Sequence, residues 1–98
     1  MDRPNLYVLA RLLEALARAP ASIRKTQLQL VAGLNYTVFA KYLAFLAERG
    51  MVDVVSDDDG ERLRLTAKGD ALYRFLADGI ARILDERAEG GLSRQEGR

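Results

Sequence analysis

Residues 26–50, TQLQLVAGLNYTVFAKYLAFLAERG, have the pattern of two helices joined by a tight turn. Gly33 follows a short segment of helical periodicity, and glycine readily adopts the left-handed conformation that ends many helices. Asn35 is a good N-cap for the next helix, which we expect over residues 36–49, with Gly50 just beyond its end. The segment therefore predicts a helix-turn-helix motif.

One more helix is expected before this motif, at about residues 4–18. Leucines recur there at helical spacing, and Pro20 lies just beyond them. Ser22 precedes the shorter apolar segment that Gly33 ends, and it is a candidate N-cap for the second helix. The chain up to Gly50 thus contains three predicted helices.

The periodicity changes after Gly50. Residues 51–55 are mostly apolar and β-branched, residues 57–60 are the turn sequence Asp-Asp-Asp-Gly, and residues 62–65 alternate arginine with leucine. This pattern predicts a β-hairpin. Thr66 is then an N-cap candidate for a long final helix of continuous apolar periodicity.

Three helices, a hairpin and a long helix follow one another in the order of a winged helix-turn-helix. The predicted fold class is therefore mainly α with a small β-hairpin. We expect the winged helix-turn-helix over residues 1–65 and the long helix, which serves dimerisation, over residues 66–89. Glu89-Gly90-Gly91 disfavours further helix, so a disordered tail is expected over residues 90–98.

The composition argues against catalysis and against metal binding. The 98 residues include neither Cys nor His, so the common zinc sites and the Ser-His or Cys-His catalytic arrangements cannot be built. Three consecutive aspartates in a short turn do not resemble a dedicated calcium or magnesium loop. We expect no enzymatic activity, no cofactor and no metal ion, and no small-molecule effector because nothing resembles a sensor domain.

Charge is unevenly distributed along the chain. Up to Gly50 there are 7 basic and 3 acidic residues, whereas the remainder contains 8 basic and 11 acidic residues. The balance of +4 against −3 indicates that a polyanionic partner would contact the first half. No apolar stretch approaches the about 18 residues of a membrane span, and the first residues contain no apolar signal core. We expect a cytoplasmic, nucleoid-associated protein.

Five segments make the chain resemble a known family: Ile23-Arg24-Lys25-Thr26-Gln27, Gly33-Leu34-Asn35-Tyr36, Tyr42-Leu43, Glu48-Arg49-Gly50-Met51-Val52 and Leu65-Thr66-Ala67-Lys68-Gly69. They are similar to segments of the small archaeal winged-helix DNA-binding proteins that dimerise through an antiparallel coiled coil. The last segment recurs in many winged-helix families and is therefore specific for the fold. The segments Arg24-Lys25-Thr26-Gln27 and Leu34-Asn35-Tyr36 narrow the choice among those families. The resemblance implies transcriptional regulation or genome organisation.

The third predicted helix has one side suited to DNA. Its core side contains Phe39, Tyr42, Leu43 and Leu46, and its other side contains Thr37, Ala40, Lys41, Ala44 and Glu48. Small and polar side chains near the N-terminal end would let the helix enter the major groove, with Thr37 and Lys41 facing bases or phosphates. The alternative is the solvated face of an amphipathic helix, and the helix-turn-helix context favours DNA.

Candidate contacts also flank that helix. Arg24 and Lys25 are unfavourable for the dipole of the second helix, which favours a polyanionic partner over a merely solvated basic pair. Asn35 acts first as a cap, and Tyr36 combines inward packing with a hydroxyl that can reach a phosphate. The predicted DNA-binding residues are Arg24, Lys25, Asn35, Tyr36, Thr37, Lys41, Arg62 and Arg64.

The tip of the hairpin differs from an ordinary DNA-binding wing. Asp57, Asp58 and Asp59 put three negative charges where phosphates would lie, so we expect the tip to stay off DNA or to limit how tightly it binds. Arg62 and Arg64 share the exposed face of the returning strand, where they either offset the acidic tip or grip DNA.

The long final helix predicts a homodimer. Its first turns, around Leu72 and Phe75, are expected to pack on the domain, whereas later apolar residues project past it as an exposed stripe. Leucines of the first helix are expected to help cover this stripe, and the alternative is that the stripe folds back on its own domain. The predicted interface contains Leu6, Leu9, Leu13, Leu76, Ile80, Ile83 and Leu84.

The sequence therefore predicts a dimeric winged-helix protein that binds double-stranded DNA with its third helix in the major groove. It would act as a transcriptional regulator or a chromatin-associated protein. The alternative is a winged-helix module that docks another protein and does not bind DNA. A protein that neutralises several phosphates loses affinity for duplex DNA steeply as the salt concentration rises, whereas a protein-docking module need not. The salt dependence of duplex binding therefore separates the two functions.

Overall fold

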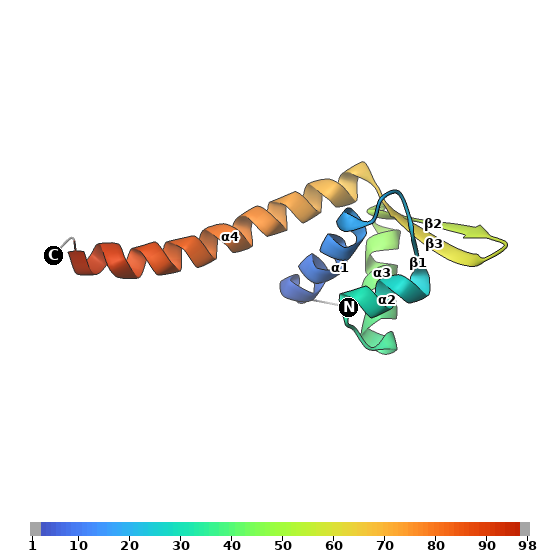
Figure 1. Cartoon of the computed structure of the whole chain (residues 1–98), viewed down its shortest axis with the longest axis horizontal. Coiled ribbons are helices and arrows are strands. Elements are labelled where there is room, and N and C mark those ends of the chain that lie inside the picture. Colours follow the sequence, from blue (N-terminus) through green and yellow to red (C-terminus); the bar gives the residue numbers. More distant parts are fainter. Residues whose placement is uncertain (1–2, 97–98) are drawn as a thin grey trace.

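The computed structural model describes residues 3–96, with side chains up to residue 85. Its elements are α1 (Leu6–Arg18), β1 (Ile23–Arg24), α2 (Lys25–Ala32), α3 (Tyr36–Glu48), β2 (Val52–Asp57), β3 (Gly60–Leu65) and α4 (Ala67–Glu96). Three short helices and a small sheet form a body, and α4 projects from it (Figure 1). The predicted order of three helices, a hairpin and a long helix is confirmed.

Local signals place the helix-turn-helix where the sequence predicts it. The side-chain oxygen of Asn35 accepts a hydrogen bond from the N–H of Val38 at 2.9 Å, which caps α3. Gly33 has a φ of 68° and ends α2 in the left-handed conformation. The chain bends by 112° between α2 and α3, an angle typical of this motif. Among the described residues, no single helix is long and apolar enough to cross a membrane.

A two-residue strand that the sequence does not predict joins the hairpin. In β1, Ile23 pairs with Leu63 and Arg24 pairs with Arg62, giving an antiparallel sheet in the order β1-β3-β2. Because the chain is extended here, α2 begins only at Lys25, and its N-cap position is Arg24, without a side-chain cap. The expected capping role of Ser22 is therefore wrong.

The core lies between α1, α2, α3, the sheet and the first turns of α4. Its largest fully buried side chains are Phe39, Leu12, Leu13, Leu28, Leu46 and Leu63. α3 thus contributes the apolar side that its periodicity predicts, and its opposite side stays outside the core. Burial of one such side chain stabilises the fold by about 1.5–3 kcal/mol.

The face of α4 that packs on the body differs from the expected one. Leu76 is only 6% exposed and belongs to the core, whereas Phe75 is 74% exposed. Leu72 and Tyr73 are partly buried against the same core. Successive helical residues point about 100° apart, so burial of Leu76 turns Phe75 away from the body. The expectation that Phe75 packs and Leu76 projects is therefore wrong.

Near its start, α4 approaches the chain before β2 very closely. A Cβ added at Gly69 would collide with the carbonyl oxygen of Met51 and would lie 2.7 Å from a methyl carbon of Leu65. Thr66 links the start of α4 to the chain before β2. Its hydroxyl donates a hydrogen bond to the Gly50 carbonyl at 2.8 Å and accepts one from the Gly69 N–H at 3.1 Å. Gly69 thus permits an approach that a larger residue would prevent.

The far end of α4 also differs from the expectation. The helix continues to Glu96, past the Glu89-Gly90-Gly91 sequence where we expected it to end. Glycine is less favourable than alanine in a helix by about 1 kcal/mol, but unlike proline it keeps the backbone donor. The helical backbone of residues 90–96 thus differs from the disordered tail expected there, and residues 97–98 lie outside the described residues.

Candidate nucleic-acid interface

One side of α3 is turned to the outside of the molecule. Phe39, Leu43 and Leu46 are buried, and Tyr42 is half-buried. On the opposite side Ala40 is half-buried, and the exposed residues are Thr37, Lys41, Ala44 and Glu48. Lys41 has no carboxylate within ion-pair distance among the described side chains. The Lys41 ammonium group therefore lies on the exposed side of α3 without an acidic partner among the described side chains.

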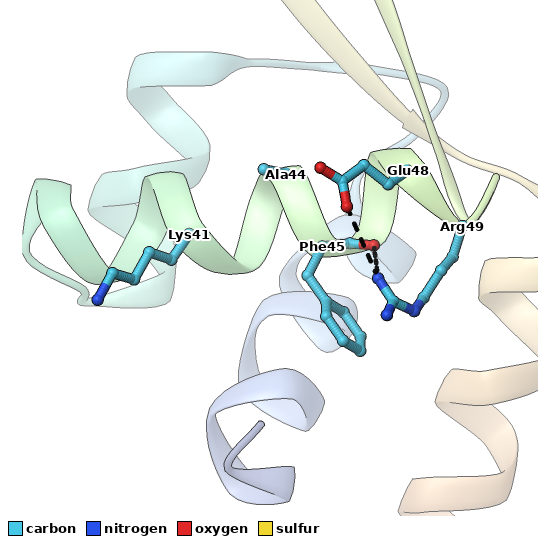
Figure 2. A pocket seen from close by; sticks show the side chains of 5 residues that line it. All are labelled: Lys41, Ala44, Phe45, Glu48 and Arg49. Carbon is cyan, nitrogen blue, oxygen red and sulfur yellow. Dashed lines mark hydrogen bonds and ion pairs between the residues drawn. The ribbon is translucent and has the colours of Figure 1, made fainter. Parts of the chain in front are cut away.

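A hollow of about 330 Å³ lies along the C-terminal part of α3, lined by Lys41, Ala44, Phe45, Glu48 and Arg49 (Figure 2). The Arg49 guanidinium carbon lies 3.7 Å from the centre of the Phe45 ring, and Arg49 also pairs with Glu48 at 3.9 Å. Figure 2 shows Lys41 pointing away from this cluster. Arg49, the cation at the end of α3, thus contacts Phe45 and Glu48. Lys41 instead extends beside the N-terminal half of α3.

A groove of about 220 Å³ separates α3 from the wing, which is the hairpin of β2 and β3. Ala40, Ala44 and Ala47 line its α3 side, and Val54 lines the wing. The α3 side of this groove is thus formed largely by small side chains.

The basic residues at the start of α2 are paired with the wing. Arg24 donates to the carbonyl oxygen of Asp59 at 3.0 Å, and its guanidinium lies 3.2 Å from the Asp59 carboxylate. The Lys25 ammonium lies 3.2 Å from the Glu61 carboxylate. All four side chains are partly exposed, so each ion pair contributes about 0–1 kcal/mol. Two of the predicted DNA-binding residues thus pair with carboxylates of the wing, and one of them, Arg24, pairs with its acidic tip.

The three aspartates of the tip have different surroundings. A carboxylate oxygen of Asp57 accepts a hydrogen bond from the N–H of Asp59 at 2.8 Å, which orders the turn. Asp59 pairs with Arg24, whereas Asp58 is exposed and has no side-chain partner among the described residues. No group of three or more Asp, Glu, Cys or His within the part of the chain that the structure describes is placed to hold a metal ion.

The two arginines of β3 hold the sheet together rather than offsetting the acidic tip. Arg62 donates to the Ser22 hydroxyl at 2.8 Å and to the Ser22 carbonyl at 3.4 Å, which links β3 to the chain before β1. Arg64 pairs with Asp53 at 2.9 Å, directly across the β2–β3 ladder. Arg62 is half-buried, while Arg64 is exposed.

The remaining predicted contacts lie at the N-terminal end of α3. Asn35 is exposed, and its carboxamide caps the helix as expected. Tyr36 is exposed as well, so its ring does not pack inward. Sequence reasoning missed the role of Tyr42, whose hydroxyl accepts a hydrogen bond from the N–H of Asn5 at 2.8 Å. This contact fixes the start of α1 against α3.

A second candidate surface lies between α1 and α4. A groove of about 500 Å³ runs there, with Tyr7 and Ala10 on one side and Tyr73, Ile80 and Leu84 on the other. Of the residues predicted to form a dimer interface, Leu6, Ile83 and Leu84 are 50–58% exposed, and Ile80 is half-buried. The other three lie in the core of the chain: Leu9, Leu13 and Leu76.

The model of the winged helix-turn-helix family matches residues 3–83. The chain belongs to this family. Sso10a-2, a DNA-binding protein from Sulfolobus solfataricus, has a similar structure with a TM-score of 0.79, 21% sequence identity and 98% coverage of both chains. F93 from STIV, a winged-helix DNA-binding protein, has a TM-score of 0.76 and 17% identity over 83% of this chain and 95% of its own.

A regulator also shares the fold. The PcaV transcriptional regulator from Streptomyces coelicolor, in complex with its natural ligand, has a TM-score of 0.72 and 27% identity over 98% of this chain and 76% of its own. No curated protein matches the chain. The winged-helix fold that the resemblance to small archaeal DNA-binding proteins implies is thus confirmed.

In this winged helix-turn-helix, the predicted DNA-binding residues have different surroundings. Lys41, Thr37 and Tyr36 are exposed on α3, whereas Arg24 and Lys25 are paired with the wing. Arg62 and Arg64 stabilise the sheet. The pairing of α2 with the wing joins residues 35 or more positions apart, so no local sequence signal could have revealed it.

Proposed function

We propose that this winged helix-turn-helix protein binds double-stranded DNA as a homodimer, with α3 in the major groove. It would act as a transcriptional regulator or as a chromatin-associated protein of the nucleoid. The observation that carries this proposal is the uncovered side of α3, where Lys41 has no acidic partner among the described side chains. The descriptions of Sso10a-2 and F93 as DNA-binding proteins and of PcaV as a transcriptional regulator support it.

The chemistry of α3 suits close contact with a duplex. Ala40 and Ala44 leave room for the edges of the groove, and an alanine methyl can contact the methyl group of thymine. The Thr37 and Tyr36 hydroxyls lie near the N-terminal end, where they can donate to phosphates or bases. Lys41 contributes a point charge for a backbone phosphate.

The cations of α2 are a second set of contacts in this proposal. Arg24 and Lys25 are held by partly exposed ion pairs, and such pairs are weak enough for a phosphate to replace the carboxylate. Arg64 is exposed and paired in the same way. Arg62 would act indirectly, by holding β3 and β1 together through Ser22.

The dimer would form through α4 and the start of α1. A second copy seated on the groove between these helices would cover Leu84, which lines it, and would extend to the exposed Leu6 and Ile83 of the same two helices. Burial of each such side chain is worth about 1.5–3 kcal/mol, which makes association favourable when several are covered on both copies. Two α3 helices held at a fixed separation would then contact two half-sites on one duplex.

Binding of a fluorescent duplex at a series of salt concentrations tests this function. Affinity should fall steeply as salt rises, and Lys41→Ala should weaken binding and reduce the salt slope by about one unit, because one phosphate contact is lost. Lys68→Ala is the matched control: it removes one exposed lysine from the start of α4 and should leave binding unchanged. A folded Lys25→Ala, Lys41→Ala double variant with wild-type affinity would exclude the proposed surface.

The exposed Asp58 at the wing tip is the one observation that favours a protein-docking module instead. Such a module has no need to neutralise phosphates. It would show either no duplex binding or an affinity that changes little with salt, so the same titration separates the two functions.

A further inference from the structure

A hollow of about 320 Å³ lies beside β1, and none of its lining residues comes from α3. Its polar lining consists of Arg18 from the end of α1, Arg24 from β1 and Arg62 from β3, together with Ser22 and Gln27. The other lining residues are apolar. Three arginines from three different elements therefore line one depression, which we name the arginine pocket.

No carboxylate side chain lines the arginine pocket. Arg18 pairs with Glu14 at 2.9 Å and Arg24 pairs with Asp59 at 3.2 Å, but both carboxylates lie outside the lining. Arg62 donates only to the neutral oxygen atoms of one serine among the described residues. Three positive charges thus have two carboxylate partners, and an excess of positive charge is left around the pocket.

The existing contacts of these arginines leave donors for a ligand. A guanidinium carries five N–H donors in a planar fork whose geometry matches carboxylate and phosphate oxygens. Arg62 uses two of its nitrogen atoms on Ser22, and Arg18 uses one on Glu14. The ion pairs of Arg18 and Arg24 are partly exposed and contribute little, so an anion can share or replace them.

We propose that the arginine pocket binds a phosphate group. Several guanidiniums around a concave site match the three or more oxygen atoms of a phosphate better than the two of a single carboxylate. The phosphate would belong either to a small phosphorylated molecule or to the DNA backbone beside the segment that α3 contacts. The pocket shares Arg24 and Arg62 with the proposed DNA surface but contains no residue of α3, so the test at Lys41 and the test at Arg18 can fail independently.

Isothermal titration calorimetry of the full chain with inorganic phosphate tests the site, at constant ionic strength maintained with chloride. Wild type should show saturable binding, and Arg18→Gln should weaken it about tenfold, the usual effect of losing one hydrogen bond to a charged group. Arg18 is exposed at the end of α1, so this variant should remain folded. Arg62→Lys, which keeps the charge but loses the fork, should also weaken binding.

Arg74→Gln is the matched control. Arg74 is exposed on α4, forms the same type of i,i+4 ion pair with Asp70 as Arg18 forms with Glu14, and does not line the pocket. Phosphate affinity should be unchanged in this variant. An equal loss in Arg18→Gln and Arg74→Gln, or no saturable binding by wild type, would overturn the proposal.

Competition by a short duplex separates the two sources of phosphate. If the pocket holds a backbone phosphate, the duplex displaces inorganic phosphate, and Arg18→Gln lowers the salt slope of duplex binding by about one unit. If the pocket serves a small phosphorylated molecule, duplex binding leaves the affinity for inorganic phosphate unchanged in wild type. Both outcomes support a phosphate site and assign it to one ligand.

Discussion

At the scale of single residues, two glycines of α4 have opposite surroundings. Gly69 lies against the carbonyl of Met51 and the side chain of Leu65, so that a Cβ has no room there. Gly79 has nothing within 4 Å of a Cβ position. The same substitution should therefore have opposite effects on stability at the two positions.

Gly69→Ala should lower the free energy of unfolding by about 1–3 kcal/mol, because the methyl group forces α4 away from the chain before β2. Gly79→Ala should raise it by about 0.5–1 kcal/mol, since alanine loses less backbone entropy than glycine in a helix. Urea denaturation followed by circular dichroism measures both values. A Gly69→Ala variant as stable as wild type would show that α4 can shift without loss of packing.

The residues that cap the helices could be identified from sequence because capping is local. Asn35 bonds to the N–H three positions later, and Gly33 ends its helix through its own backbone conformation. Ser22 failed as a predicted cap because Arg62, forty positions away, uses its hydroxyl, while β1 extends the chain up to Arg24. Tertiary contacts of Ser22 and β1, rather than the local sequence pattern, therefore determine where α2 begins.

At the scale of elements, the wing and the start of α2 act on each other. Asp59 holds Arg24 through its carboxylate and its carbonyl, while Asp58 has no such partner in the described part of the chain. Removal of the Asp59 charge should release Arg24 for a phosphate contact. Removal of the Asp58 charge should reduce only the electrostatic repulsion between the wing tip and the DNA phosphates. The two aspartates thus form a matched pair for mutation.

At low salt, Asp59→Asn should strengthen duplex binding by up to about fivefold more than Asp58→Asn does. This factor corresponds to about 1 kcal/mol, the free energy of one exposed ion pair. Fluorescence anisotropy with one duplex measures both variants. Equal gains would mean that Arg24 does not contact DNA. A loss of affinity in both would mean that the aspartates order the hairpin or accept hydrogen bonds from base edges.

The elements themselves could be predicted from sequence to different degrees. The helix-turn-helix and the hairpin have clear periodicity and turn residues, and both lie where we expected them. The β1 strand has two residues, too few to show any periodicity. In α4, Leu72, Phe75 and Leu76 are all apolar, so periodicity allows more than one buried face. Packing against α1 selects the face that contains Leu76.

At the scale of the whole molecule, the exposed apolar residues of α4 predict self-association. Ile83→Asp and Leu84→Asp should each shift the proposed dimer toward monomer, because a charge buried at the interface lacks a partner. Leu30→Asp is the control, since Leu30 is exposed on α2 and does not line the groove between α1 and α4. Sedimentation equilibrium at micromolar concentration measures the result. A monomeric wild type, or a dimer that tolerates both substitutions, contradicts the model of association.

The length of α4 has a consequence for how the protomer moves through solvent. The molecule measures 64 × 26 × 23 Å and has a radius of gyration of 16.4 Å, whereas a compact domain of this size has about 13 Å. An elongated particle meets more friction than a sphere of equal mass. A single 10.9 kDa chain should therefore elute early from a gel-filtration column and tumble slowly about its short axes, as a heavier globular protein does.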